Sequence, residues 1–209
     1  VSFDGLTLKA RYFDNNSKNT VLLFHGYRSS ALRDFSCAVE MYTKIGLNVL
    51  LCDQRSHGRS EGKYISFGVL ESRDVLSWIE FVARRYSPEK LVLGGLSMGA
   101  TTVILACGYD LPESVKAVVA DCGFSSPVDI ILKVGKQSFK INASFFIPFL
   151  NLACKLLGKF SITEVDTVKA LKKSKIPVLF IHGKDDGLVP YEMSQRGYEN
   201  APEGSRILI

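Results

Sequence analysis

The sequence lacks the features of a membrane-spanning, metal-binding or disulfide-stabilised protein. Its most apolar stretch, 141–158, is interrupted by polar residues and a proline, so no segment predicts a membrane-spanning helix. No two of the five cysteines have the spacing of metal ligands, and their wide separation argues against a disulfide framework. We therefore expect neither a metal nor another cofactor.

The cysteines lie mostly within apolar runs, which favours buried, reduced thiols and a reducing compartment such as the cytoplasm. They are Cys37, Cys52, Cys107, Cys122 and Cys154. The sequence starts at Val1 rather than at a methionine, so any targeting segment is expected to lie upstream. A membrane-tethered protein is the alternative localisation that the residues leave open.

The sequence also lacks a basic motif interleaved with aromatic residues and a recognition-helix pattern, so a nucleic-acid partner is not expected. The formal net charge of +5 is nevertheless uneven, because residues 128–175 contain nine lysines and three acidic residues. A solvated surface is the simplest interpretation of these lysines. The alternative is peripheral contact between this lysine-rich segment and an anionic membrane.

Short apolar runs alternate with longer helical patterns along the chain. This alternation predicts an α/β protein with a mostly parallel central sheet and helices on both faces. Residues 66–86 have apolar residues such as Val75 and Ile79 at helical spacing, which predicts a helix with Glu71 and Asp74 on its polar side. The expected strands begin at Thr20, Leu47, Lys90, Val115, Ile176 and Ser205.

The chain is long enough for one sizeable core, and we expect a single domain over all 209 residues. Residues 1–13 predict a β-hairpin with its turn at Asp4 and Gly5. The gap of roughly fifty residues between the fourth and fifth expected strands is too long for a plain crossover in a compact domain. It predicts an inserted cap at about 126–175.

One motif carries a chemical prediction. Gly95, Ser97 and Gly99 form a G-x-S-x-G sequence placed where a strand should end and a helix should begin. In that context the flanking glycines allow a sharp turn that presents the serine hydroxyl as a nucleophile. The helix that starts at Met98 would direct free N–H groups and its dipole toward the same place. The alternative is a glycine-rich turn that contains a serine by chance.

Four motifs that occur in order make the chain similar to the α/β hydrolases. They are LLFHGYRSS, DQRSHGRSEGKYISFG, the G-x-S-x-G sequence and IHGKDDGLVP. Within that superfamily the chain resembles the bacterial serine hydrolases and esterases, which also resemble the catalytic domains of prolyl-oligopeptidase-type peptidases. The resemblance covers nearly the whole chain and implies an α/β-hydrolase fold with a helical cap insert.

The resemblance also implies roles for individual residues. Ser97 would be the catalytic nucleophile, and Asp186 would be the acid of the catalytic triad, with Asp185 as the alternative. The backbone N–H groups of Tyr27 and Met98 would form the oxyanion hole. The alternative for the two aspartates is a solvated turn.

Four further residues would support the site without touching the substrate. His25 and Gly26 belong to the loop that supplies the second oxyanion donor, the Tyr27 N–H. Asp53 and Arg55 would pair and fix the loop after the second core strand.

The sequence has only three histidines, and each belongs to a motif with another role. They are His25, His57 and His182. The family order of serine, acid and histidine places the base after the last strand. We therefore expect the histidine of the triad a few residues beyond Ile209.

The resemblance implies a serine hydrolase that cleaves small-molecule carboxylic esters through an acyl-enzyme intermediate. Apolar side chains of the cap would form a lid over an apolar acyl or alkyl group, and the alternative, which must hold for most of them, is ordinary packing on the sheet edge. Those side chains include Phe139, Phe145, Phe146 and Phe149. Two alternatives stand beside the ester hydrolase: an amidase or peptidase with the same triad, and a hydrolase-like binding protein that has lost its base.

Overall fold

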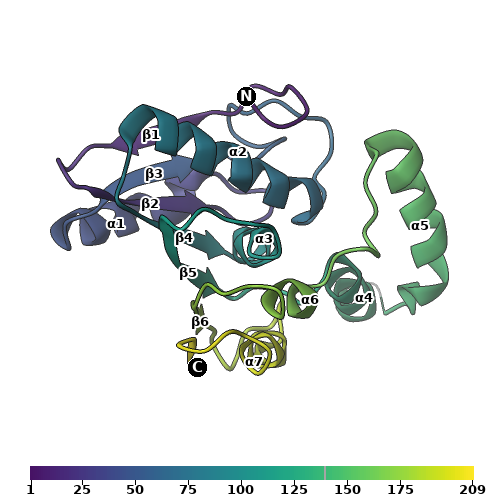
Figure 1. Cartoon of the computed structure of the whole chain (residues 1–209). Helices are drawn as coiled ribbons and strands as arrows, with labels where there is room; N and C mark the ends of the chain where they lie inside the picture. The colour runs from purple at the N-terminus through teal and green to yellow at the C-terminus, as the bar shows by residue number, and fades with distance from the viewer. Residues whose placement is uncertain (139) are drawn as a thin grey trace.

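The chain folds around a seven-stranded sheet with one antiparallel edge strand (Figure 1). The computed structural model describes residues 1–138 and 140–209, so the expected contribution of Phe139 to a lid lies outside the described residues. All neighbouring strands are parallel except β1 and β3, in the order β1-β3-β2-β4-β5-β6-β7, which confirms the predicted sheet. The strands are β1 (Ala10–Phe13), β2 (Asn19–Phe24), β3 (Asn48–Cys52), β4 (Lys90–Leu96), β5 (Val115–Asp121), β6 (Val178–Ile181) and β7 (Arg206–Leu208).

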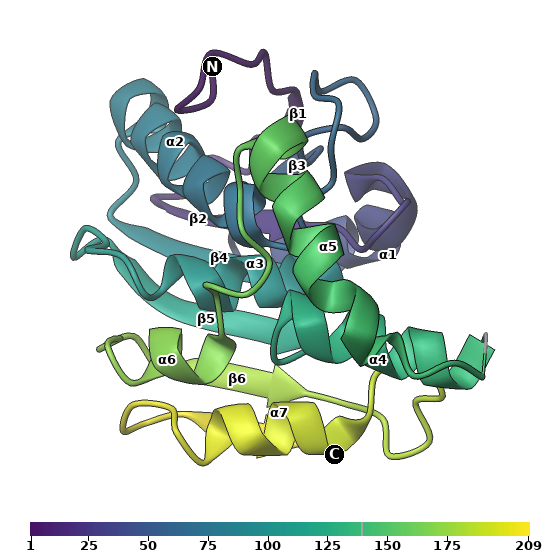
Figure 2. The same cartoon turned by 90° about the vertical axis from the view of Figure 1, so that its right-hand side faces the viewer.

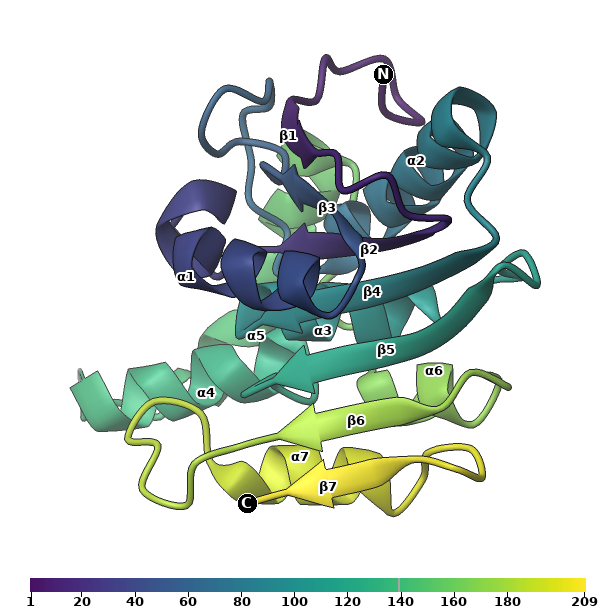
Figure 3. The same ribbon diagram turned by 90° about the vertical axis from the view of Figure 1, so that its left-hand side faces the viewer.

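Helices lie on both faces of this sheet. Figure 3 shows α1 in front of the sheet and α2, α3, α6 and α7 behind it. A 3-10 turn, η1, and a π-helical turn, η2, flank α5. The bounds are α1 (Ala31–Lys44), α2 (Val69–Tyr86), α3 (Met98–Ala106), α4 (Pro127–Ser138), η1 (Ala143–Phe146), α5 (Ile147–Ala153), η2 (Cys154–Gly158), α6 (Thr167–Leu171) and α7 (Tyr191–Tyr198).

Each face of the sheet has its own core because side chains alternate along a strand. Leu22 and Phe24 of β2 pack in one cluster with α2 and α3. Val21 and Leu23 of the same strand pack in a second cluster with α1. The central strands are therefore buried on both faces, which explains why their sequences are continuous apolar runs.

The helix predicted at 66–86 begins at Val69 and has a different polar side from the one expected. Glu71 and Asp74 are buried, with 1 % and 3 % of their surface exposed. The Glu71 carboxylate accepts a hydrogen bond from the Gly68 N–H at 2.9 Å and so closes the first turn of α2. Helical periodicity does not distinguish such a buried cap from a solvated carboxylate.

The predicted hairpin at 1–13 is wrong. Gly5 does lie in a turn, where its N–H donates to the Ser2 carbonyl oxygen at 3.1 Å. Residues 1–9, all of which the structure describes, form no strand, and β1 pairs with β3 instead. The turn signal is correct, but the partner strand lies about forty residues away, beyond the reach of a local pattern.

The segment between β5 and β6 is helical, as expected of a cap. Its helices α4 and α5 stand out from the sheet, with α5 as the outermost element, as Figures 1 and 2 show. Three side chains expected in the lid, those of Phe145, Phe146 and Phe149, are more than half exposed. No helix in the described part of the chain is long and apolar enough to cross a membrane.

Candidate active site

Ser97 stands at the sharp turn between β4 and α3. Its φ of 53° and ψ of −114° are unusual for a residue with a side chain, so the backbone is strained there. A Cβ on Gly95 would come within 2.2 Å of the Gly99 carbonyl oxygen, and one on Gly99 within 1.8 Å of the Phe24 carbonyl oxygen. Strand and helix can approach this closely only because both positions are glycine.

The loop after β2 passes beside Ser97. A Cβ on Gly26 would lie 3.6 Å from the Ser97 Cβ, and the next residue, Tyr27, lines the same cavity as Ser97. Among the turn, loop and capping bonds of the described residues, neither the Tyr27 N–H nor the Met98 N–H donates to an acceptor. Both amides are therefore free to bind an oxyanion, and Met98 adds the N-terminus of α3.

A hydrogen-bond network around His25 holds this loop. The His25 ring accepts from the Gln54 N–H at 3.0 Å through Nε2, and its Nδ1–H donates to the Gly26 carbonyl oxygen at 2.7 Å. The Gln54 side chain in turn donates to the His25 carbonyl oxygen at 2.6 Å and accepts from the Thr102 hydroxyl at 3.1 Å. Burial lowers the pKa of His25, which favours the neutral ring that this network needs.

His57 supports the same loop from its other end. Its Nε2 accepts from the N–H of Arg28, the residue after Tyr27, at 3.1 Å, and its Nδ1–H donates to the Arg55 carbonyl oxygen at 2.8 Å. The rings of His25 and His57 contact each other edge to face, with centroids 4.8 Å apart. The two histidines therefore fix the backbone on both sides of Tyr27.

The predicted pairing of Asp53 with Arg55 is wrong. Arg55 is buried, and its guanidinium donates to Asp74 at 2.6 and 2.7 Å and to Asp4 at 3.0 Å. Asp53 instead accepts from the Ala31 N–H at 3.2 Å. Both residues hold the loop after β3, but through partners that are distant in sequence.

Asp186 lies after β6, next to the buried His182. Its Oδ1 accepts from the N–H groups of Leu188 and Val189 at 2.8 and 2.9 Å, and its Oδ2 lies 3.6 Å from His182 Nε2. His182 itself donates to the Val189 carbonyl oxygen at 2.8 Å and accepts from the Ser194 hydroxyl at 2.6 Å. Both ring nitrogens of all three histidines are thus engaged, so none is placed to act as the base.

Two residues near the site belong to none of the recognised motifs. Asp121 ends β5, and its carbonyl oxygen accepts from the Ser97 N–H at 2.7 Å. Cys122 follows with a φ of 45°. Burial raises the pKa of the Asp121 carboxyl, and it raises the pKa of Cys122 to about 12, so this thiol is protonated at neutral pH. The sequence signal that could have found them is their place at the end of a parallel strand, because such strand ends meet at one edge.

An apolar cavity of about 510 Å³ opens at Ser97. The rings of Tyr27 and Phe67 stack on one side of it, with centroids 5.3 Å apart. The other walls come from α4 and from the loops after β5 and β6, through residues that include Phe124, Ile130, Val134, Leu188 and Val189. Such a cavity suits a hydrocarbon group next to the serine. Within the described residues, no group of three or more His, Cys, Asp or Glu side chains could hold a metal ion.

The sheet, the strained serine turn and the loops at the carboxyl edge define an α/β hydrolase. The comparison with known families agrees and is more specific. The chain belongs to the serine aminopeptidase S33 family, which matches residues 15–162.

Curated relatives are similar in sequence over most of this chain. The Bacillus subtilis (strain 168) protein YqkD is 28% identical over 186 residues, which cover 88% of this chain and 61% of the relative. The Escherichia coli (strain K12) protein YfhR is 27% identical over 198 residues, which cover 93% of this chain and 62% of the relative. The chain therefore spans about three fifths of the length of these relatives.

Solved structures include esterases. The Pyrococcus furiosus esterase Pf2001 has a TM-score of 0.78 and 27% identity, and the match covers 99% of this chain and 78% of the esterase. Est1E from Butyrivibrio proteoclasticus, solved with ferulic acid bound, has a TM-score of 0.71 and 19% identity over 98% of this chain and 86% of its own. The similarity to Est1E is evidence for the fold alone.

Proposed function

We propose that the protein is a serine hydrolase that cleaves carboxylic esters with an apolar acyl or alkyl part. The observation that carries this proposal is the strained Ser97 at an apolar cavity of about 510 Å³, beside two free amides. The similarity to the Pyrococcus furiosus esterase supports the ester class. The narrower resemblance to prolyl-oligopeptidase-type catalytic domains stays a prediction.

In this mechanism the Ser97 oxygen attacks the ester carbonyl carbon while its proton passes to a base. The N–H groups of Tyr27 and Met98 donate to the carbonyl oxygen as it becomes negative, and the loss of one such donor typically costs about 3 kcal/mol. The alcohol leaves with the proton from the base, and water then releases the acid from Ser97 by the same path.

The base is the part that the described residues do not supply, because all three histidines are engaged elsewhere. We propose a histidine from polypeptide outside these 209 residues, oriented by Asp186. Asp186 has one oxygen held by two backbone N–H groups, so its carboxylate is fixed for such a role. Without that histidine, we expect only the residual rate of about 10³ to 10⁴ over water that an oxyanion hole and binding provide.

The second candidate is an amidase or peptidase, and the description of the family as serine aminopeptidases favours it. An amine is a poorer leaving group than an alcohol, so this reaction depends more strongly on protonation by the base. The third candidate, a binding protein without a base, would neither turn over esters nor react with a fluorophosphonate probe.

The location of the activity is part of the proposal. All five cysteines are free, which supports a reducing compartment such as the cytoplasm. The expectation of buried thiols is correct for Cys52 and Cys107, whereas Cys37 is exposed on α1.

The test is hydrolysis of p-nitrophenyl butyrate by full-length protein that includes the polypeptide proposed to supply the histidine, with an aminoacyl p-nitroanilide as the competing substrate class. We expect ester turnover, a loss of about 10⁴-fold or more in Ser97→Ala, and labelling of Ser97 by a fluorophosphonate. The matched control is Ser36→Ala, which removes an exposed hydroxyl on α1 and should leave turnover unchanged. Equal turnover in Ser97→Ala would remove the proposal, and a preference for the anilide would replace it with the peptidase.

A further inference from the structure

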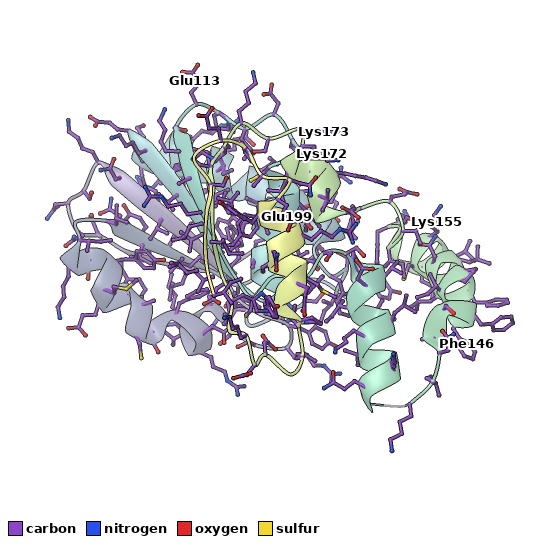
Figure 4. All side chains as sticks on the ribbon, turned by 90° about the horizontal axis from the view of Figure 1, so that it is seen from below. Glu113, Phe146, Lys155, Lys172, Lys173 and Glu199 are labelled. Carbon is purple, nitrogen blue, oxygen red and sulfur yellow. The ribbon has the colours of Figure 1, made fainter. Side chains whose placement is uncertain are left out.

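The outermost helix of the molecule carries large apolar side chains on its outside. Phe145, Phe149, Leu152 and Leu156 are 71 %, 62 %, 55 % and 72 % exposed, and they follow one another at intervals of four, three and four residues. This spacing places them on one face of the continuous helical segment η1-α5-η2. Phe146, at 56 % exposure, lies beside them, and Figure 4 shows it on the outer side of the cap. We call these five residues the outer cap face.

The opposite side of the same segment is also apolar, and it lines a cavity. Leu150, Ala153, Cys154 and Leu157, again at helical spacing, line a second cavity of about 430 Å³ beneath α5. This second cavity shares Tyr27, Phe67 and Ile131 with the cavity at Ser97. The inner side therefore faces this cavity, whereas every side chain of the outer cap face is more than half exposed and lines neither cavity.

The stretch of chain that contains the outer cap face is positively charged. Residues 128–159 contain five lysines and a single acidic residue, Asp129. Lys136, Lys140, Lys155 and Lys159 are exposed, and only Lys155 has an acidic partner among the described residues, Glu164 at 3.2 Å. A cationic partner would be repelled, and a second copy of the chain would bring lysines against lysines at a two-fold interface. An anionic surface with an apolar layer beneath it would attract the lysines and bury the exposed apolar side chains.

We propose that the outer cap face docks on the surface of an anionic phospholipid bilayer, with its rings below the headgroups and the flanking lysines among the phosphates. The docking does not depend on the hydrolase activity. If the activity is also as proposed, the second cavity adjoins the cavity at Ser97 through three shared lining residues, and we expect an ester dissolved in the bilayer to enter beneath α5.

The test is sedimentation with vesicles of phosphatidylcholine and phosphatidylglycerol, using Ser97→Ala so that turnover plays no part. We expect binding at low salt, weaker binding at high salt because the charge attraction is screened, and little binding to phosphatidylcholine alone. Phe149→Ser with Leu156→Ser should bind at least about tenfold more weakly, because two inserted apolar side chains are lost. The matched control is Met41→Ser with Ile45→Ser, two exposed apolar residues of the α1 region, and it should bind like the parent.

A second variant tests the same proposal in case the first variant binds weakly only because it has lost its structure. Lys136→Glu with Lys140→Glu leaves every apolar residue in place and should reduce binding at low salt by about tenfold through reversed attraction to the headgroups. Three results would overturn the proposal: no sedimentation with anionic vesicles, equal loss in the α1 control, or a dimer that Phe149→Ser with Leu156→Ser dissociates. Failure of ester hydrolysis would leave this result untouched, since it is measured separately.

Discussion

Two carboxylates lie at neighbouring strand ends close to Ser97, and their environments differ. Asp186 has its Oδ1 held by two backbone N–H groups and is half-buried, whereas the neighbouring Asp185 is exposed. Asp121 ends β5, and burial raises the pKa of its carboxyl. An orienting acid must stay ionised beside the base, which favours Asp186.

Asparagine substitutions separate these two roles, because asparagine keeps the shape and removes the charge. We expect Asp186→Asn to lower kcat for ester hydrolysis by about 10⁴-fold, the size seen when a triad acid is replaced in this way. Asp121→Asn should lower it by less than about tenfold, because a residue that does not orient the base contributes little transition-state charge stabilisation. Steady-state kinetics of both variants in the full chain measure this, and the reverse ranking would transfer the role to Asp121.

At this scale the sequence predicts some residues well and others not. The role of Gly95 and Gly99 can be predicted, because two glycines that flank a serine between a strand and a helix indicate a tight turn. The ion-pair partners of Arg55 cannot be predicted in this way, because Asp4 and Asp74 come from segments far apart in the sequence. A carboxylate nearby in sequence, Asp53, is the obvious choice locally, yet its oxygens are already used by backbone N–H groups.

At the scale of elements, the buried Arg55 ties the loop after β3 to α2 and to the amino-terminal turn. Arg55→Met should lower the free energy of unfolding by about 3 to 5 kcal/mol, because it leaves the buried Asp74 without its cation. Urea denaturation measures the loss. The matched control is Arg84→Met, which breaks an exposed pair with Glu80 on the same helix and should cost less than about 1 kcal/mol.

The same variant should be sensitive to pH. Burial raises the pKa of Asp74 to about 6 even with Arg55 present, and removal of the guanidinium raises it further. An acid whose pKa is higher in the folded than in the unfolded state takes up a proton on folding, so stability rises as pH falls through the folded pKa. The destabilisation of Arg55→Met should therefore be smaller at pH 5 than at pH 8, a range that spans the Asp74 pKa of about 6. An equal loss at both values would mean that Asp74 finds another cation.

Element boundaries show what periodicity can and cannot predict. The strands β2 to β6 start within about two residues of their predicted positions, because apolar runs between turn residues are distinctive. The burial of Glu71 and the pairing of β1 with β3 were not predictable, since both depend on contacts that form only in the folded chain.

At the scale of the whole molecule, the composition of the cap predicts apolar helices but not their orientation. The α5 segment has apolar residues on two faces, so the pattern does not say which face turns inward. Leu150 and Ala153 line the inner cavity, whereas Phe145, Phe149 and Leu156 do not line it and are more than 60 % exposed. From the sequence, most of these apolar side chains are expected to pack on the sheet edge and a few to face the pocket, whereas Phe145, Phe146 and Phe149 are more than half exposed.

The strand order also places the proposed nucleophile and its proposed acid on strands that should differ in local stability. Ser97 follows β4, which has seven residues and a partner on each side, whereas Asp186 follows the four-residue β6, whose outer neighbour β7 has only three. Short strands near an edge open at a lower free energy than central ones. Backbone amides of β6 should therefore exchange with deuterium faster than those of β4, which mass spectrometry of peptic fragments would resolve. Equal protection would refute this, and unequal protection would mean that gentle heating displaces Asp186 while most of the sheet is still intact.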